Sequence, residues 1–146
     1  MLSAAKHLAS CRVYPDRMKP FLFAMILGAA FGFAQKQPDA KPYQYFRLGN
    51  AQAVAVKTTP SFAFMGGGKD LDAAFQWLCS HGEGGDLLVI RHSGDDSYNP
   101  YIKALCKLNS VATVVLPTRA AAIEPCVAEK ISGASMNCIA GGAQAK

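Results

Sequence analysis

One short polar stretch carries most of the side chains that could do chemistry. It places a cation, an imidazole, a hydroxyl and two carboxylates close together, as Arg91, His92, Ser93, Asp95 and Asp96. A Ser/His/carboxylate triad cannot be built from such near neighbours, because the base must reach the nucleophile from a separate element. We therefore interpret His92 as a rim or hydrogen-bonded structural histidine and Arg91 as the partner of a nearby carboxylate. Arg91 and Ser93 are candidates for the rim of a pocket.

A glycine run at 66–68 could expose backbone N–H groups ahead of a helix, which is how many proteins bind phosphate. The run lacks the spacing of the known phosphate-binding motifs. In addition, Asp70 and Asp72 stand where the anion would bind. We expect a tight turn from a strand into a helix, with Gly67 and Gly68 on the pocket rim.

A second glycine pair, Gly141-Gly142, follows an apolar run and is followed by Gln144. An apolar strand that ends in glycines is how open α/β folds bring bare N–H groups to a ligand at the carboxyl edge of the sheet. This stretch is therefore a candidate ligand-binding edge.

Short apolar runs alternate with amphipathic stretches, and these predicted strands and helices would position the loops described above. Strands are predicted at 61–65, 86–90, 111–116 and from residue 135 onward. Asp70 and Asn99 are predicted to be the N-caps of two helices, Thr118 opens a third helical stretch, and Pro125 interrupts it. This alternation predicts a doubly wound, mostly parallel α/β sheet of the flavodoxin or Rossmann kind. The polar loops would then meet at its carboxyl edge.

The first 34 residues have the pattern of a leader. An apolar run at 21–33 follows Met18-Lys-Pro and ends in a small-x-small site at Ala34, which predicts a signal peptide that starts at Met18. An uncleaved anchor is the alternative. After cleavage we expect no stable membrane span, an extended segment at 35–60, and a partial α/β domain at 61–146. The protein would be exported to the periplasm or the extracellular space.

Charge and cysteine content limit the partners further. Much of the net charge of +5 lies in the leader, so the rest shows no nucleic-acid footprint. No Cys-x-x-Cys pair occurs, so we predict neither a metal site nor a cofactor. Cys79 and Cys106 each lie near the end of a predicted helix that leads into a strand, and we pair them first. Cys126 and Cys138 could form a second disulfide or remain buried free thiols.

Several longer motifs resemble one known family. They are FMGGGKDLDAAFQW at 64–77, GDLLVIRHSGDDSYNPY at 85–101, SVATVVLPTR at 110–119 and IAGG at 139–142. In order and spacing they resemble the cyanophycinase-like members of the S51 peptidase family.

The resemblance implies a class I glutamine-amidotransferase-like fold and a serine hydrolase that cleaves peptide or isopeptide bonds of acidic peptides, such as the storage polymer cyanophycin. Gly141, Gly142 and Gln144 match the family's loop beside the nucleophile, which helps to bind substrate or the oxyanion. Ala143 departs from the family's usual Asp.

The family's nucleophile lies further along, in a Gly-Thr-Ser-Ala-Gly elbow that this sequence lacks. We therefore expect a fold truncated after about four strands, the N-terminal portion of an exported hydrolase, without a catalytic residue of its own. A small secreted, non-catalytic α/β binding module is the alternative.

Overall fold

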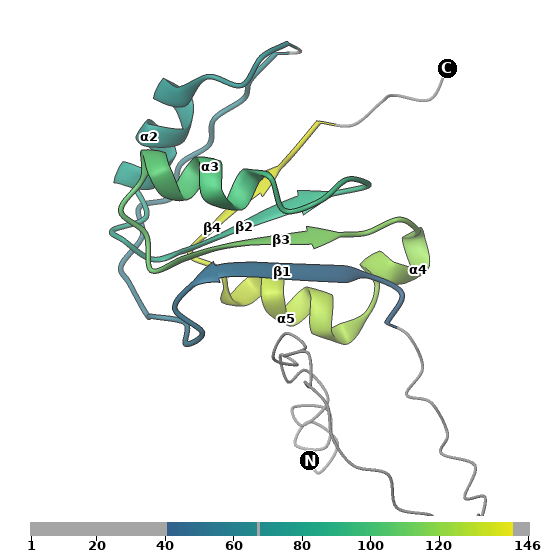
Figure 1. The fold of residues 1–146 in the computed structure, drawn as a ribbon. Coiled ribbons are helices and arrows are strands. Elements are labelled where there is room, and N and C mark those ends of the chain that lie inside the picture. The colour runs from purple at the N-terminus through teal and green to yellow at the C-terminus, as the bar shows by residue number, and fades with distance from the viewer. Residues whose placement is uncertain (1–40, 67, 142–146) are drawn as a thin grey trace, which may run out of the picture. The chain divides into compact units, whose positions relative to one another are not determined.

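The computed structural model describes residues 41–66 and 68–141, and they form an α/β fold with a four-stranded mixed sheet and four helices (Figure 1). The predicted leader lies outside the described residues, as do Gly67, Gly142 and Gln144. Within the described part, no helix is long and apolar enough to cross a membrane.

The sheet has the strand order β1-β3-β2-β4. Its strands are β1 (Gln44–Gly49), β2 (Asp86–Arg91), β3 (Ser110–Val115) and β4 (Met136–Ile139). β2 runs parallel to both β3 and β4, as the alternation of strands and helices predicts. β1 pairs antiparallel with β3, so the sheet is mixed.

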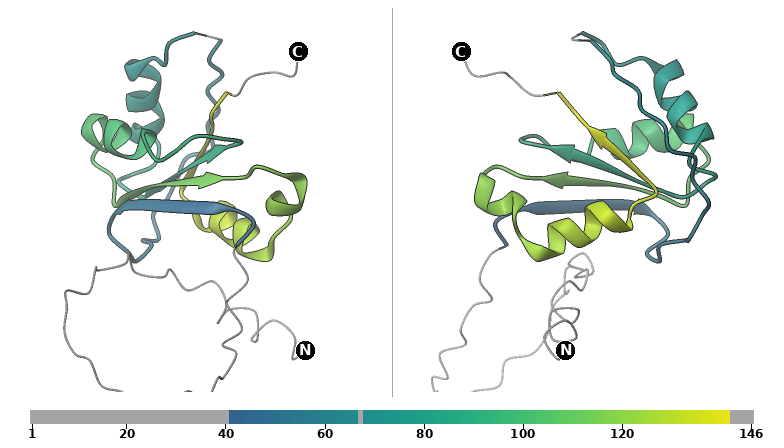
Figure 2. Two further views of the ribbon diagram at one scale, coloured as in Figure 1. Left: turned by 45° about the vertical axis from the view of Figure 1, so that its right-hand side comes forward. Right: turned by 180° about the vertical axis from the view of Figure 1, so that it is seen from behind.

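The prediction of a strand at 61–65 is wrong. This segment is irregular, and Phe62 and Phe64 are 83% and 95% exposed. β4 pairs directly with β2, so the sheet offers no position between them for another strand. The remaining strand, β1, comes from the segment 35–60, which we expected to lie extended along the edge of the domain. The chain between β1 and α2 (Asp72–Ser80) therefore runs beside the sheet rather than within it (Figure 2).

Two of the predicted N-caps are also wrong, although helices begin close to both residues. α2 begins two residues after Asp70, with Leu71 as its N-cap. α3 (Tyr98–Leu105) has Ser97 at its N-cap, and Asn99 is instead buried, where its Oδ1 accepts a hydrogen bond from Thr113 Oγ1 at 2.7 Å.

The third helical stretch follows the prediction. Thr118 caps α4 (Arg119–Ala122) by accepting a hydrogen bond from the N–H of Ala121 at 3.1 Å. α5 (Pro125–Gly133) then starts at the proline that interrupts the pattern, as expected for a residue that needs no intrahelical N–H bond.

The core has two apolar clusters, which β2 divides. Leu87 and Val89 pack in the cluster below α2 and α3, whereas Leu88 packs in the cluster that includes Val127 of α5. Successive side chains of a strand point to opposite faces, so a strand buried on both faces reads as a continuous apolar run. This is why β2 could be predicted from sequence. Figure 1 shows α3 and α5 on opposite faces of the sheet.

A disulfide joins Cys79 to Cys106, the pair that the sequence analysis placed first. Its S–S distance is 2.06 Å and its Cα atoms are 6.0 Å apart. It connects the end of α2 to the end of α3, so the helices of one layer are covalently linked. Of the described cysteines, only Cys138 carries a free thiol.

Candidate functional site

The loops that follow β2, β3 and β4 meet at one edge of the sheet. The N–H of Leu116, just after β3, donates to the carbonyl of Arg91 at 2.8 Å. The N–H of Ala140, just after β4, donates to the carbonyl of Ile90 at 3.0 Å. Ligands of open α/β folds gather at this carboxyl edge, which makes it the candidate site.

Arg91 organises the loop after β2. Its Nη1 donates to the carbonyl oxygen of Asp95 at 3.0 Å and lies 3.6 Å from the Asp95 carboxylate, so the expected pairing with a nearby carboxylate is confirmed. Its guanidinium also lies 5.1 Å from the ring centroid of Tyr98. Gly94 has a φ of +101°, and a Cβ there would lie 2.7 Å from Arg91 Nη2. The loop after β2 therefore folds around the Arg91 guanidinium.

Asp95 is held from the other side of the same loop. Its Oδ1 accepts a hydrogen bond from the N–H of Ser97 at 3.0 Å. Hydrogen bonds from the backbone and side chain of Ser97, and then the charge of Arg91, lower the pKa of the Asp95 carboxyl. These contacts favour the ionised form of Asp95 and hold its carboxylate within the loop.

His92 has a structural contact. Its Nδ1 lies 3.3 Å from the carbonyl oxygen of Leu116, to which it donates as a hydrogen-bonded histidine. This confirms the interpretation of His92 as a hydrogen-bonded structural histidine. Ser93 is exposed on the same loop, where a rim residue would lie.

Two tyrosines of α3 bind the carboxylates that precede and begin α2. Tyr98 Oη donates to Asp70 at 2.7 Å, and Tyr101 Oη donates to Asp72 at 2.5 Å. These hydrogen bonds are the main reason that the pKa of each tyrosine is raised to about 12. Both rings also pack on Phe75, with centroids 6.2 and 5.6 Å away.

The Asp–Tyr pairs determine what the turn after the glycine run can do. They fix two carboxylates at the start of α2, where a phosphate loop would need to receive an anion. Gly68 is in the left-handed region at φ +131°, and a Cβ there would meet nothing within 4 Å. The turn is therefore an open, acidic rim. The two tyrosines that hold these carboxylates were not predicted as site residues, because they are 28 and 29 positions away from them in the chain.

β4 contributes a thiol that is poorly suited to nucleophilic attack. Cys138 is half-buried, and burial raises the pKa of its thiol. The nearby charge of Asp70 raises that pKa further. Thiolates are the reactive form of cysteine, so a neutral Cys138 serves as an apolar side chain. Gly141 follows β4, and a Cβ there would meet nothing within 4 Å, which leaves its backbone open.

No group of three His, Cys, Asp or Glu residues could hold a metal ion within 41–66 and 68–141. A shallow depression of about 400 Å³ lies beside α2. It is lined by residues of the irregular segment, chiefly Phe62 and Phe64, and by Leu71 and Trp77. These four side chains are between 42% and 95% exposed.

A buried carboxylate at the opposite edge of the sheet was also missed. Asp86 is 6% exposed, and it accepts hydrogen bonds from Arg47 at 3.1 Å, from the N–H of Val54 at 3.0 Å and from Asn109 at 2.8 Å, as well as from Ser110. Burial alone would raise its pKa, but the hydrogen bonds, led by that of Ser110, hold it below the ordinary value. A carboxylate so fully paired is structural.

Comparison of the chain with known protein families, with characterised proteins and with solved structures finds no match. The resemblance to the cyanophycinase-like hydrolases therefore rests on the sequence motifs alone.

Proposed function

We propose that the chain is the N-terminal portion of an exported cyanophycinase-like serine hydrolase and supplies one wall of its substrate site. The observation that supports this most directly is the outer edge of β4. Among the described residues β4 pairs only with β2, and Ile139 at its end is 81% exposed. An unpaired edge next to a parallel strand is where one more strand would add.

The family pattern supplies a reason for such a strand. In cyanophycinase-like proteins the strand after the glycine pair carries the Gly-Thr-Ser-Ala-Gly elbow. Paired with β4, that strand would extend a doubly wound sheet and bring a serine next to Gly141 and Gly142. Their N–H groups would then stabilise the oxyanion, and Gln144 would contact the substrate. The loop of Arg91 and Ser93 would form the rim for an acidic peptide.

Without the elbow, this portion hydrolyses nothing by the family mechanism. Removal of the nucleophile alone lowers kcat by about 10⁶-fold in a serine protease. The Cys79–Cys106 disulfide supports export, because disulfides persist in oxidising compartments.

Two measurements test the proposal. The first is the nucleotide sequence after codon 142, where we expect a Gly-Thr-Ser-Ala-Gly elbow in one of the reading frames. The second is labelling with a fluorophosphonate, which requires an activated serine. The chain alone should remain unlabelled, and the chain extended through the downstream elbow and its remaining domain should be labelled and should cleave cyanophycin.

The matched control for labelling is the extended protein with the elbow Ser replaced by Ala, which should be unlabelled. Absence of the elbow from all downstream frames would contradict the proposal. Labelling of the chain as it stands would contradict it too.

The exposed apolar depression favours a second candidate, a secreted binding module that uses this surface without catalysis. Monomeric protein with a sharp, cooperative thermal transition would support the module, because a hydrolase fragment with an open β4 edge should associate or melt broadly.

A further inference from the structure

The sheet has a second open edge, at β1. Among the described residues β1 pairs only with β3, so alternate residues of β1 turn their N–H and C=O groups away from the sheet. Because β1 and β4 lie at opposite ends of the strand order, this edge is separate from the proposed hydrolase wall. Nothing in the inference below depends on the proposed function.

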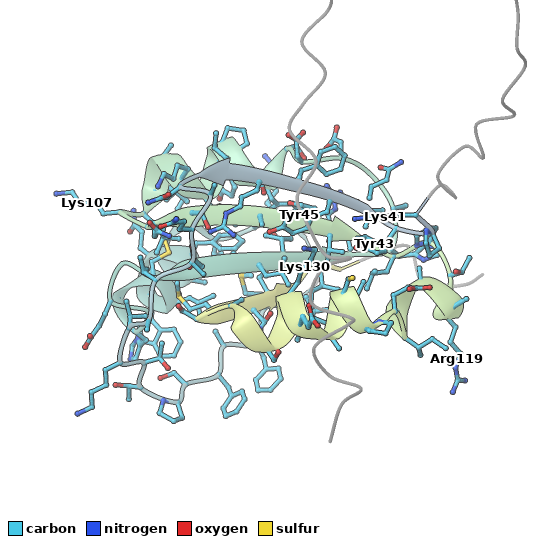
Figure 3. All side chains as sticks on the ribbon, turned by 90° about the horizontal axis from the view of Figure 1, so that it is seen from below. Lys41, Tyr43, Tyr45, Lys107, Arg119 and Lys130 are labelled. Carbon is cyan, nitrogen blue, oxygen red and sulfur yellow. A yellow bond between two sulfur atoms is a disulfide. The ribbon has the colours of Figure 1, made fainter. Side chains whose placement is uncertain are left out.

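Cations gather on the α5 side of β1. Figure 3 shows Lys41 and Lys130 beside Tyr43 and Tyr45. Lys130 Nζ lies 4.0 Å from the ring centroid of Tyr45, and Lys41 Nζ lies 5.8 Å from that of Tyr43. We call these four residues the basic strip.

The cations of the strip are not neutralised by the part of the chain that the structure describes. Arg47, next along β1, already pairs with Asp86 at 3.1 Å, but Lys41 and Lys130 form no ion pair within 41–66 and 68–141. Burial lowers the pKa of Lys130, and the charges of Lys41 and Arg47 lower it further. A bound anion would relieve this repulsion.

Tyr43 adds an unsatisfied polar group beside the strip. Its side chain is 7% exposed, and its hydroxyl has no hydrogen-bond partner among the described residues. Buried polar groups are nearly always paired in folded proteins. The strip therefore combines two unpaired cations, one unpaired hydroxyl and an open strand edge.

The positive charge of the basic strip determines which kind of strand could pair with β1. A second copy that docks through its own β1 would bring the same lysines, so like charges would meet. Lysine on an edge strand is a common device against such self-pairing. A strand that carries carboxylates meets no such repulsion from Lys41 and Lys130, and its backbone can pair with β1.

We propose that the outer edge of β1 binds an extended acidic segment of another protein, which adds to the sheet as a strand and places carboxylates against Lys41 and Lys130. Two carboxylates of this chain limit the affinity, because Glu124 and Glu129 lie near enough to raise the pKa of Tyr43, although burial raises it more. Replacing Glu129, which is exposed, should therefore tighten binding.

The test measures fluorescence anisotropy of a labelled probe, acetyl-Val-Asp-Val-Asp-Val-Asp-amide, with the purified full chain. We expect saturable binding that Lys41→Glu weakens about tenfold, the effect of turning an exposed attraction into a repulsion of similar size. Glu129→Gln should tighten it. Binding should also weaken in about 1 M salt, where the Debye length falls to about 3 Å.

Lys107→Glu is the matched control, because it makes the same charge change on an exposed lysine that Figure 3 shows away from the strip. It should leave the affinity unchanged. Lys41 is exposed as well, so its substitution tests the site without loss of the fold.

Two further probes separate strand pairing from simple charge attraction. A peptide with Lys in place of Asp should not bind, and an acidic peptide methylated on alternate backbone nitrogens should bind much more weakly. Equal binding of the methylated peptide would overturn the proposal, as would equal weakening by Lys107→Glu or no binding of the acidic probe. Displacement of the probe by anionic phospholipid vesicles would assign the strip to a membrane and would overturn it too.

Discussion

The Asp86 carboxylate and the Arg47 guanidinium join the first residue of β2 to the edge strand β1, across the intervening strand β3, at 3.1 Å and 39 positions apart in the chain. Their side chains are only 8% and 17% exposed. β1 and β2 share no backbone hydrogen bonds, because β3 lies between them. The ion pair therefore links these two strands directly, at the end of the sheet where β2 begins.

Replacing Asp86 by Asn should destabilise the fold by about 3 kcal/mol, because it leaves the part-buried Arg47 without its counter-charge. The free energy of unfolding in urea measures this loss. Asp96→Asn, on an exposed loop, is the control and should change the midpoint little. An unchanged urea midpoint for the Asp86 variant would show that the pair contributes no net stability.

The same carboxylate predicts a pH dependence. Because the pKa of Asp86 is lower in the folded chain than the ordinary value of 3.8, the folded state binds its proton less well than the unfolded state. The resulting stability is complete above pH of about 4 and is lost as the pH falls below that value. Urea titrations at several acidic pH values should show a shallower loss for Asp86→Asn than for the wild-type chain. Parallel curves would contradict the assignment.

Breaking the Cys79–Cys106 disulfide should cost about 3 kcal/mol, the value for a closed loop of this order, here with a separation of 27 residues. Cys106→Ser should lower the melting temperature, and so should reduction of the wild-type chain. Cys138→Ser is a suitable control, since Cys138 forms no disulfide. A chain that melts identically with and without reductant would lack this bond in solution.

The exposed phenylalanines of the irregular segment should limit solubility. Phe62→Ser with Phe64→Ser should raise the monomer fraction in size-exclusion chromatography and leave the stability nearly unchanged, because both side chains are more than four-fifths exposed at 83% and 95%. Phe75→Ala is the contrasting substitution. Phe75 is 1% exposed, and its removal should cost about 3–5 kcal/mol. A fall in stability for the double Ser variant would instead place Phe62 and Phe64 in a packed interface.

The central strands and the third helical stretch could be predicted because their signals are local. β2 and β3 are continuous apolar runs, and Thr118 and Pro125 mark helix starts through their own backbone and side-chain chemistry. The strand at 61–65 was mispredicted because an apolar run indicates only a local preference, whereas strand pairing depends on distant segments, and β4 rather than this segment pairs with β2.

The contacts of the candidate site were predictable only over short distances. Arg91 lies four residues from the carboxylate it pairs with, so the sequence indicated that pair. Tyr98 reaches Asp70 across 28 positions, and Arg47 reaches Asp86 across 39. No periodicity links such residues. Asn99 was assigned a capping role because its type is favoured at N-caps, whereas its burial against Thr113 depends on how α3 packs on the sheet.

The disulfide also divides the chain mechanically. β2, from Asp86 to Arg91, lies inside the covalent ring that Cys79 and Cys106 close, whereas β1, β3, α5 and β4 lie outside it. A force applied between β1 and β3 is therefore carried past β2 through the sulfur–sulfur bond. β2 would bear no tension in this loop until the bond is reduced.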